Sequence, residues 1–491
     1  MKEAGVSEAE FDVIVIGAGP AGEVCAGRLA DGGLSVAVVE RDLVGGECSY
    51  YACMPSKALL RPGQALAEAR RVPGAAEAAV GQLDVTAALR RRDEVVHDLH
   101  DDTQLPWLEE RGIVLVRGHA TVLGEREVRV AEEAGTEPGA KSAAAKSGAG
   151  KGGAGKGGVD DHKLRARRAI VLATGSSAAI PPIPGLRACA PWTNREVTTA
   201  HAVPASLLIL GGGVVGVEMA CAYSSLGAHV TLVEASERLI AREEPFASEQ
   251  VHESLESQNV DVVLGVPAAA AGRDERTGAV TLELEDGRSL AGEELLVAVG
   301  RRPNTGDLGL EMLGLQPGKP VAVQDNMRAA DHEWLYAIGD VNGRALLTHM
   351  GKYQGRVAAE HILGRPVPLL SDGLRSPRVI FTEPQVAAVG HTLASALEDG
   401  LKARAVDAPT GGNAGGSFVG HDAPGTSRIV VDEDRSTIVG ATFTGVDVGE
   451  TLQAATIAVV GEVPLERIWH AVPCFPTRSE VWLNLLEEYG L

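Results

Sequence analysis

Residues 11–22 read Phe-Asp-Val-Ile-Val-Ile-Gly-Ala-Gly-Pro-Ala-Gly. The apolar, β-branched run Phe11–Ile16 predicts a buried parallel strand, and it breaks at a turn that contains three glycines. A helical pattern follows over Glu23–Ala30, and a second strand-like run, Ser35–Val39, ends at Glu40. This order is the fingerprint of a dinucleotide site. The glycines let a pyrophosphate approach the helix N-terminus, and the acid accepts hydrogen bonds from ribose hydroxyls.

The same pattern returns near the middle of the chain. The strand-like run Ser206–Leu210 leads into the turn Gly211–Gly216, a helical stretch covers Val217–Leu226, and the next strand, Val230–Val233, ends at Glu234. The spacing between the first glycine and the acid is the same in both copies. Two fingerprints at matching spacing predict two bound dinucleotides.

The acid of the second copy bears on the choice of nicotinamide nucleotide. A carboxylate at Glu234 accepts hydrogen bonds from ribose hydroxyls and repels a 2′-phosphate, so the sequence favours NADH over NADPH. Arg238 and Arg242 lie close in sequence. They would weaken this preference if their side chains reached the same ribose.

A pair of cysteines lies in residues 45–57, which read Gly-Gly-Glu-Cys-Ser-Tyr-Tyr-Ala-Cys-Met-Pro-Ser-Lys. If Cys48 lies in a loop that enters a helix, Cys53 follows about one turn later and the two sulfurs come within disulfide reach. A helix start lowers the pKa of a thiol, and Pro55 is tolerated in a first helical turn. The pair therefore predicts redox chemistry, against the alternative of two buried structural thiols.

The length and composition bound the class of protein. The chain has 491 residues, enough for about three domains. It carries 66 acidic and 45 basic residues, which argues against a nucleic-acid partner or an anionic membrane. Its 6 cysteines are too few for a disulfide scaffold. Residues Met1–Asp12 lack a signal-peptide pattern, and we find no apolar run long enough to span a bilayer, so we expect a soluble cytoplasmic protein.

The remaining stretches are less regular. Ala65–Leu108 reads as helical and Val114–Val130 as short strands, while residues 132–161 form a low-complexity insert. For that insert, a disordered surface insertion is favoured over a tethering or binding arm. From Pro377 onward, strand-like runs alternate with helical stretches, the last over Ser479–Tyr489, which predicts a C-terminal α+β domain. We find no phosphate loop and no metal-ligand spacing in that part of the sequence.

Taken in order, these motifs resemble those of the class I FAD-dependent pyridine nucleotide-disulfide oxidoreductases, the family of dihydrolipoyl dehydrogenase, glutathione reductase and mercuric reductase. The resemblance covers nearly the whole chain. It implies an α/β fold with two Rossmann-like dinucleotide-binding domains, one for FAD and one for NAD(P), plus a C-terminal α+β dimerisation domain in a homodimer. The implied boundaries are 10–180 for the first part of the FAD domain, 181–299 for the NAD(P) domain, 300–365 for the second part of the FAD domain, and 366–491 for the dimerisation domain.

The resemblance also assigns roles to individual residues. Cys48 matches the interchange thiol that attacks the substrate, and Cys53 matches the thiol packed on the flavin. Lys57 and Glu218 match an ion pair beside the flavin ring, and Glu480 matches a glutamate near the C-terminus. The implied cofactor-binding residues are Gly17, Gly19, Gly22, Glu40, Arg41, Gly46, Lys57, Thr174, Gly175, Gly211, Gly213, Gly216, Glu234, Gly300, Arg301, Gly339 and Asp340.

The implied reaction passes electrons from NADH through FAD to a Cys48–Cys53 disulfide, and the resulting thiolate attacks a small-molecule acceptor. Asp340 matches the aspartate that holds the ribityl chain of FAD. For this residue a helix cap is the alternative interpretation, because Asp is a favoured N-cap.

One segment departs from the family pattern. Residues 472–480 read Val-Pro-Cys-Phe-Pro-Thr-Arg-Ser-Glu. Disulfide-reducing members carry a His-Pro pair before the glutamate, and that histidine, from the partner subunit, serves the thiols as acid and base. Here Pro476 and Glu480 match, but Phe475 stands in place of the histidine. General acid–base help is typically worth about 10²–10⁴-fold, so we expect ordinary dithiol exchange to be impaired. His470 is five residues away and is expected to be a surface or packing histidine.

Three interpretations of Phe475 remain open. In the first, which we favour slightly, the chain reduces a disulfide or dithiol-type acceptor, and another group, such as Cys474, Tyr50 or Tyr51, replaces the histidine. It reduces a quinone, a metal ion or a dye, which need no such base. Or its cysteines are vestigial, in which case a non-catalytic FAD-binding scaffold is the rival. Tyr50 and Tyr51 either line an apolar acceptor pocket or simply pack. Mercury reduction is disfavoured, because the chain ends without an extra cysteine pair.

Overall fold

We analysed a computed structural model of the chain, which describes residues 8–131 and 161–491. The low-complexity insert expected over 132–161 lies almost wholly outside the described residues. The chain divides into two compact units. The first comprises residues 1–55, 93–177 and 301–372, and the second comprises residues 56–92, 178–300 and 373–491. The finer domain boundaries expected from the sequence stay a prediction.

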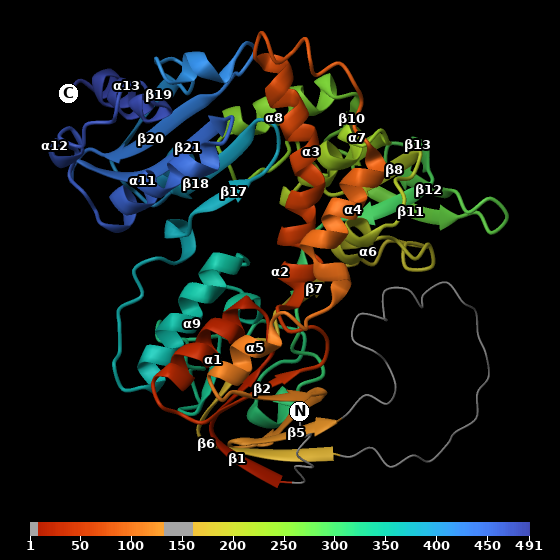
Figure 1. The fold of residues 1–491 in the computed structure, drawn as a ribbon, viewed down its shortest axis with the longest axis vertical. Helices are drawn as coiled ribbons and strands as arrows, with labels where there is room; N and C mark the ends of the chain where they lie inside the picture. The colour runs from red at the N-terminus through yellow and green to blue at the C-terminus, as the bar shows by residue number, and fades with distance from the viewer. Residues whose placement is uncertain (1–7, 132–160) are drawn as a thin grey trace. The chain divides into compact units, whose positions relative to one another are not determined.

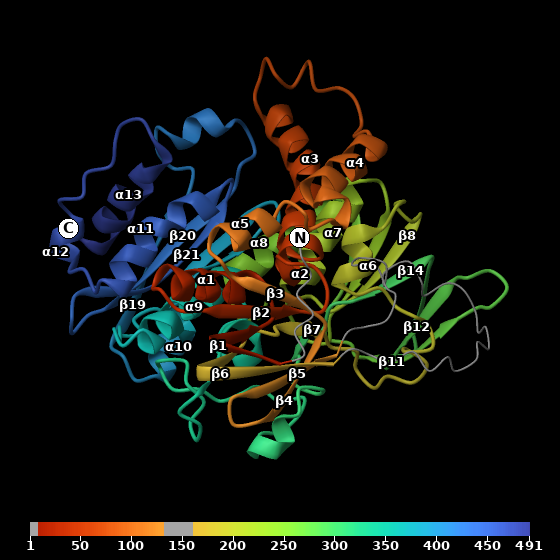
Figure 2. The same cartoon turned by 60° about the horizontal axis from the view of Figure 1, so that its bottom comes forward.

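The first unit is built on a seven-stranded sheet, ordered β3-β2-β1-β6-β5-β4 with β16 beside β6 (Figures 1 and 2). β1 runs parallel to β2 and to β6, as expected for a dinucleotide-binding sheet, and β4 and β5 form an antiparallel hairpin at the other edge. These strands are β1 (Glu8–Ile16), β2 (Val36–Glu40), β3 (Val114–Arg117), β4 (His119–Gly124), β5 (Glu127–Ala131), β6 (Asp161–Leu172) and β16 (Leu335–Ala337).

Successive side chains of β1 enter two different apolar clusters. Val13 and Val15 pack with α1 (Pro20–Asp31) and α9 (Thr348–Ile362), whereas Ile14 and Ile16 pack on the opposite face of the sheet. This alternation follows from the two-residue period of a strand. The run is buried on both faces, which confirms the strand predicted for residues 11–16.

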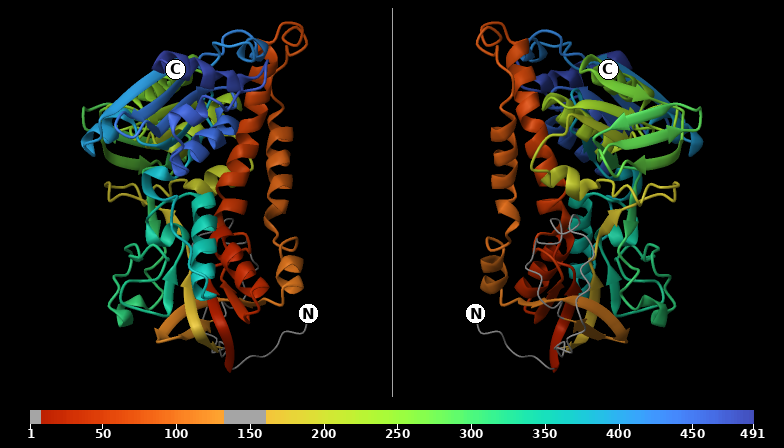
Figure 3. Two further views of the ribbon diagram at one scale, coloured as in Figure 1. Left: turned by 90° about the vertical axis from the view of Figure 1, so that its left-hand side faces the viewer. Right: turned by 90° about the vertical axis from the view of Figure 1, so that its right-hand side faces the viewer.

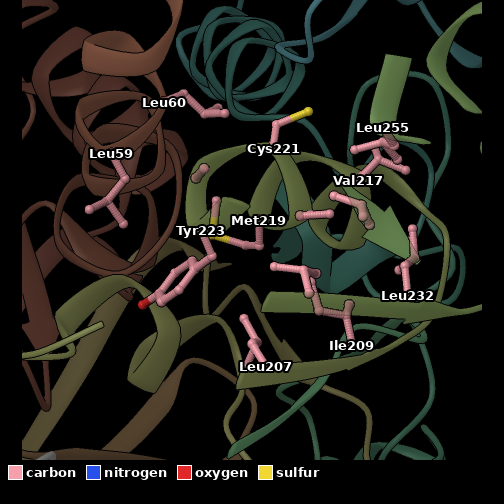
Figure 4. Close-up of a cluster of buried hydrophobic side chains, with 14 of the residues drawn as sticks. Leu59, Leu60, Leu207, Ile209, Val217, Met219, Cys221, Tyr223, Leu232 and Leu255 are labelled. Atoms are coloured by element: carbon pink, nitrogen blue, oxygen red, sulfur yellow. The ribbon is translucent and has the colours of Figure 1, made fainter. Parts of the chain in front are cut away.

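The second unit contains the second glycine fingerprint. Its four-stranded sheet is parallel, ordered β10-β9-β8-β14, with an antiparallel three-stranded sheet in the same unit. Figure 4 shows the core where α7, α8 and α3 (Cys53–Arg71) bury Met219, Leu255 and Leu59 against the sheet. The elements are β8 (Ser206–Leu210), α7 (Val214–Ser225), β9 (His229–Val233), α8 (Pro245–Ser257), β10 (Val260–Val263), β11 (Ala268–Arg273), β12 (Val280–Leu284), β13 (Ser289–Gly292) and β14 (Glu294–Val297).

The C-terminal part of the second unit is an antiparallel five-stranded sheet, ordered β17-β18-β21-β20-β19, as expected for an α+β domain. Two adjacent buried acids tie it to the dinucleotide-binding part: Glu243 accepts two hydrogen bonds from Arg378, and Glu244 pairs with Arg428. The elements are β17 (Arg378–Ile380), β18 (Gln385–Gly390), α10 (Leu393–Glu398), β19 (Ala403–Pro409), β20 (Thr426–Asp432), β21 (Thr437–Gly445), α11 (Val448–Val460), α12 (Leu465–Ile468) and α13 (Val481–Tyr489).

The helical stretch predicted over Ala65–Leu108 is broken, so that prediction is wrong in part. α3 ends at Arg71, where Pro73 and Gly74 follow, and the chain turns before it resumes in α4. Figure 3 shows α3 and α4 side by side, coloured red-orange and orange. The remaining elements are α2 (Gly46–Tyr50), α4 (Val85–Val95), α5 (Leu105–Glu110), α6 (Asn194–Thr199), β7 (Ser176–Ala178), β15 (Arg301–Pro303) and the 3₁₀ turns η1 (His97–Leu99), η4 (Leu310–Leu313), η5 (Gly339–Asn342), η6 (Gly373–Arg375), η7 (Gly416–Val419) and η8 (Arg478–Glu480).

Over the described ranges, no helix has both the length and the apolar character needed to cross a bilayer. In the same ranges, no group of three or more His, Cys, Asp or Glu side chains is arranged to hold a metal ion.

Candidate functional site

The first glycine turn leaves space in front of helix α1. Gly17 has a φ of +105°, and a Cβ there would lie 2.4 Å from the carbonyl oxygen of Ala173. A Cβ on Gly22 would lie 2.0 Å from the oxygen of Gly17. By contrast, no described atom lies within 4 Å of a Cβ placed on Gly19, the N-cap of α1. Two glycines are therefore required by close packing, and the third opens a cradle that a pyrophosphate fits.

The acid at the end of β2 holds this turn by hydrogen bonds to its backbone. Glu40 is buried; its Oε2 accepts a hydrogen bond from the backbone N–H of Ala18 (2.7 Å), and its Oε1 accepts one from Asp42 (2.8 Å). Burial raises the pKa of Glu40, and the two backbone hydrogen bonds act against that shift. The acid is thus part of the turn's structure, a role that the sequence pattern does not reveal.

The second turn repeats this geometry. Glu234 accepts hydrogen bonds from the backbone N–H groups of Gly212 (2.6 Å) and Ser236 (2.8 Å). Gly211 has a φ of +113°. A Cβ on Gly216 would lie 1.8 Å from the oxygen of Gly211, and the space around Gly213 is open. The second turn therefore fits a pyrophosphate in the same way as the first.

The two arginines near Glu234 differ in their surroundings. Arg238 donates to the carbonyl oxygens of Ala241 (2.8 Å) and Glu243 (3.0 Å) and to the hydroxyl of Ser248 (3.0 Å). Its guanidinium is therefore committed to the segment that precedes and opens α8. Arg242 is exposed to solvent.

The cysteine segment packs directly on the first glycine turn. A Cβ on Gly46 would lie 2.7 Å from the Cα of Gly19, and the N–H of Gly45 donates to the carbonyl of Ala18 (2.8 Å). Cys48 lies in the short helix α2, so the loop assumed for this residue from the sequence is wrong. Cys53 is the first residue of α3. The segment is therefore fixed beside the place where the first dinucleotide's pyrophosphate would lie.

The sulfurs of Cys48 and Cys53 form no disulfide with each other, and both contact one hydroxyl. Thr348 Oγ1 donates a hydrogen bond to Cys48 Sγ (3.0 Å) and lies 3.4 Å from Cys53 Sγ. The hydrogen bond with Cys53, followed by burial, raises the pKa of the Cys48 thiol, while the Thr348 hydrogen bond and the charge of Lys352 lower it. Thr348 opens α9, far along the chain, and sequence reasoning missed it.

The predicted ion pair is present in the second unit. Lys57 Nζ lies 2.7 Å from Glu218 Oε2, and the backbone N–H of Phe381 donates to Glu218 Oε1 (3.0 Å). The ammonium also lies 4.7 Å from the centre of the Phe381 ring. Its place beside a flavin stays a prediction.

The strand-end residues of the first unit form a polar cluster. Asp340 Oδ2 accepts a hydrogen bond from Ser176 Oγ (2.5 Å), which also accepts one from Arg301 Nε (2.6 Å). Burial raises the pKa of Asp340. Ile338, not Asp340, is the N-cap of η5, so the interpretation of Asp340 as a helix cap is wrong.

The other predicted cofactor residues have the following surroundings. Thr174 Oγ1 donates to the carbonyl of Asn304 (2.8 Å), and Gly175 and Gly339 have positive φ angles. Gly300 also has a positive φ, of +138°. Arg41 lies at the surface and contacts Asp307 (3.3 Å).

The tyrosines between the cysteines pack inside the first unit. Tyr50 and Tyr51 are 1% and 2% exposed, in a cluster with Leu43 and Val96. The phenol of Tyr50 donates weakly to the carbonyl of His100 (3.4 Å), and burial raises its pKa. The packing interpretation is confirmed, and neither residue lines an open acceptor pocket in this chain.

The C-terminal segment, by contrast, is exposed. Phe475 is 78% exposed, and Cys474 is also at the surface. Glu480 Oε2 is buried and has no hydrogen-bond partner among the described residues. His470 is exposed and its ring contacts that of Trp469, which confirms the expected surface histidine.

Comparison with known proteins places this geometry in a family. Residues 11–356 match the family described as pyridine nucleotide-disulphide oxidoreductase, and residues 376–486 match its dimerisation domain. The chain belongs to the pyridine nucleotide-disulphide oxidoreductase family. Members of this family are flavin enzymes that use FAD and NAD(P)H. The chain is therefore an oxidoreductase.

Individual relatives of this oxidoreductase span almost its full length. It is 31% identical to dihydrolipoyl dehydrogenase from Haloferax volcanii, over 97% of this chain and 95% of the relative. It is 27% identical to mercuric reductase from Staphylococcus aureus, over 96% of this chain and 81% of the relative. The fold also matches the HOCl-induced flavoprotein disulfide reductase RclA from Escherichia coli in its Cu(II) complex, with a TM-score of 0.81 at 24% identity, covering 97% of this chain and 99% of that one.

Proposed function

We propose that this oxidoreductase takes electrons from NADH and passes them through FAD and the Cys48–Cys53 pair to a disulfide or dithiol-type acceptor. The observation that carries the proposal is the placement of the cysteines. Both sulfurs contact the hydroxyl of Thr348, and the segment that bears them packs on the glycine turn at Gly19. When bound, FAD supplies hydride acceptance and two-electron transfer.

The chain's own residues would divide the work as follows. Gly17, Gly19, Gly22 and Glu40 would hold FAD, and Gly211, Gly213, Gly216 and Glu234 would hold NADH. The Cys48 thiolate would attack the acceptor disulfide, form a mixed disulfide and release one thiolate, which takes a proton from solvent. Cys53 then attacks Cys48, releases the second thiol and closes the Cys48–Cys53 disulfide, so each turnover moves two electrons.

Two features support the preference for NADH. The carboxylate of Glu234 is pinned by two backbone N–H groups at the end of β9, where a ribose would lie. The guanidinium of Arg238 is held by Ala241, Glu243 and Ser248. A 2′-phosphate would therefore meet a fixed negative charge, with Arg238 already committed elsewhere.

A second candidate is an NAD(P)H:quinone or metal-ion reductase. Phe475 favours it, because a phenyl ring cannot carry the proton that ordinary dithiol exchange needs. In this alternative, electrons leave without the cysteines. A non-catalytic FAD-binding scaffold is the third candidate, and bleaching of the bound flavin by NADH would exclude it.

The deciding experiment compares wild type with Cys48→Ser in NADH oxidation, using lipoamide, a low-molecular-weight disulfide, a quinone and a metal ion as acceptors. The proposal requires turnover of a disulfide that the variant loses. If only the quinone or the metal ion is reduced, and Cys48→Ser keeps that activity, the second candidate replaces the first. Cys189→Ser is a matched control, because Cys189 is buried in the second unit.

The setting that we propose for this activity is a cytoplasmic homodimer. Its dimerisation domain would form the interface, and its partners would be small-molecule acceptors rather than nucleic acid or membranes. Support comes from the dimerisation-domain match over 376–486 and from the formal charge of -21. Light scattering of the purified protein tests the dimer.

A further inference from the structure

The second unit contains a cavity that the proposed redox chemistry does not use. Its volume is about 620 Å³, which lies within the range of small-molecule sites. Helices α3, α7 and α8 form its wall together with Leu83 and with residues 383–384, 422–424 and 446, all of which belong to the second unit. Leu60 and Cys221, labelled in Figure 4, lie on this wall. No residue of the wall is among the predicted catalytic or cofactor-binding residues.

The serine hydroxyls of the wall already donate their hydrogens to the protein. A serine hydroxyl has one hydrogen to donate and two lone pairs that accept. Each hydroxyl here donates to a backbone carbonyl: Ser224 to Gln258, Ser225 to Ala222, Ser254 to Glu383 and Ser257 to Ser254. These serines therefore face a ligand with oxygen lone pairs and not with a free hydrogen.

The side-chain amides of the wall are engaged in the same sense. Each Nε2 donates within the protein: Gln64 to the carbonyl of Phe381 (3.0 Å), Gln250 to the hydroxyl of Thr426 (2.9 Å) and Gln258 to the hydroxyl of Ser254 (3.1 Å). The Oε1 of Gln64 is left to accept. The amides thus add acceptors to the cavity and commit their nitrogens elsewhere.

The two arginines of the wall are held by other parts of the chain. Arg70 donates from Nε and Nη2 to the carbonyls of Ala79 (3.1 Å) and Gly81 (2.6 Å). Nη2 of Arg71 pairs with the carboxylate of Glu383, and Nη1 of Arg71 is enclosed in the protein. An anionic ligand would have to displace these contacts.

The remaining groups of the wall are two carboxylates and a set of apolar side chains. Glu253 and Asp422 are exposed, and neither forms an ion pair with another described residue. Leu60, Leu66 and Leu83 supply apolar surface. The cavity therefore combines hydrogen-bond acceptors and negative charge with surface on which methylene groups can pack.

We propose that this cavity binds a small aliphatic amine with two or more ammonium groups, such as a diamine or a polyamine. An ammonium group brings three donors and no acceptor, which complements a wall of lone pairs and carboxylates. The methylene chain between the ammonium groups would pack on the leucines. The formal charge of -21 on the chain also attracts cations. The site is independent of the redox pair and of the acceptor that the enzyme reduces.

The test is a calorimetric titration of the FAD-loaded protein with 1,4-diaminobutane at fixed ionic strength. Two probes isolate the chemistry. The fully methylated bis-quaternary analogue keeps both charges and the carbon chain but has no N–H donor, whereas succinate keeps the chain length and brings carboxylates. We expect saturable binding of the diamine, binding of the quaternary analogue at least about 10-fold weaker because hydrogen bonds to charged groups are lost, and no binding of succinate.

Matched variants locate the site. Ala67→Phe fills the cavity from α3 without removing a polar group, and we expect it to weaken diamine binding at least about 10-fold, while Ala67→Ser leaves the affinity unchanged. Glu253→Gln should weaken binding about 2- to 5-fold, as for an exposed ion pair. Glu249→Gln, exposed on the same helix but outside the cavity, should have no effect. Absorbance of the bound flavin checks that each variant is folded.

Three results would overturn the proposal: no saturable heat with the diamine, equal affinity for the quaternary analogue, or preferential binding of succinate. Undiminished binding in a folded Ala67→Phe protein would overturn it as well, because the ligand would then bind elsewhere. If Ala67→Phe does not fold, the double variant Glu253→Gln/Asp422→Asn is compared with Glu249→Gln, and equal affinities in these two proteins would have the same consequence.

Discussion

The ammonium of Lys57 lies 2.7 Å from Oε2 of Glu218, and that carboxylate is almost completely enclosed, with 3% of the residue exposed. Its other oxygen is satisfied by the backbone N–H of Phe381. A buried carboxylate with one cation and one backbone donor depends on both partners, because either loss leaves a charge in an apolar site. The pair is therefore a structural element of the second unit, whatever it contributes beside a cofactor.

Removing the cation should destabilise the protein more than removing the pair. We expect Lys57→Met to lower the free energy of unfolding by about 2 kcal/mol, less than for a fully buried pair because the ammonium still reaches solvent. The double variant Lys57→Met/Glu218→Gln should recover most of that loss. Urea unfolding of wild type, Lys57→Met, Glu218→Gln and the double variant measures both the loss and its recovery. Equal destabilisation in the single Lys57→Met and double variants would show that the loss comes from something other than the stranded carboxylate.

Stability should fall with rising pH because of Glu23. This residue is half-buried in the first turn of α1, and burial raises its pKa from 4.5 to about 7, with Lys352 opposing and Glu40 reinforcing the shift. An acid with a raised pKa in the folded state binds its proton more tightly there. Ionisation of the buried Glu23 therefore lowers the free energy of unfolding. This loss is absent below about pH 4.5, grows as the pH rises to about 7 and is complete above that, at up to about 3 kcal/mol.

Glu23→Gln should remove this penalty. We expect the variant to melt at a higher temperature than wild type at pH 8 and at nearly the same temperature at pH 5. The exposed Glu110→Gln serves as control and should not change the difference between the two pH values. A gain of equal size at both pH values would mean that the substitution acts through packing rather than through the proton.

Glu234, which directly follows β9, should govern nucleotide choice. Glu234→Gln keeps an oxygen for the backbone N–H groups of Gly212 or Ser236 but removes the negative charge. We expect the ratio of kcat/KM for NADH to that for NADPH to fall by at least about 10-fold, since one close charge pair is worth roughly that much. Glu234→Ala should lower the ratio too, and it should also weaken NADH binding because the turn loses its support. A ratio that stays constant in Glu234→Gln would remove Glu234 as the discriminating residue.

The sequence predicted the parts of the site that local geometry determines. Gly22 and Gly216 are required by contacts with the first glycine of their own turn, so their spacing is a reliable signal, whereas the contacts of Gly17 and Gly211 with Ala173 and Ala298 come from distant parts of the chain. The hydrogen bond by which Glu40 holds the glycine turn at Ala18 was not predicted, because an acid that only bound a ribose would give the same sequence pattern.

The sequence did not predict which distant residues meet at the site, or where the long helix α3 ends. Thr348 meets Cys48 only because α9 packs on α1, and the two residues are 300 positions apart. A threonine at the start of a helix ordinarily predicts a cap, which conceals its contact with sulfur. α3 continues through Pro62 yet ends near Pro73, so proline alone did not mark the boundary.

Restoring a proton carrier at position 475 should raise disulfide reduction. The buried Oε2 of Glu480 has no hydrogen-bond partner among the described residues, and in the family pattern this glutamate follows the histidine that Phe475 replaces. We expect Phe475→His to increase turnover of a disulfide acceptor by about 10-fold or more, within the range of general acid–base help. The increase should depend on pH, because only neutral imidazole accepts a proton from a thiol, and it should vanish in Phe475→His/Glu480→Ala if the carboxylate orients the ring.

Phe475→Leu is the matched control and should leave the rate unchanged. If Phe475→His brings no gain in a protein that already reduces disulfides through Cys48, then proton transfer at that position does not limit the reaction.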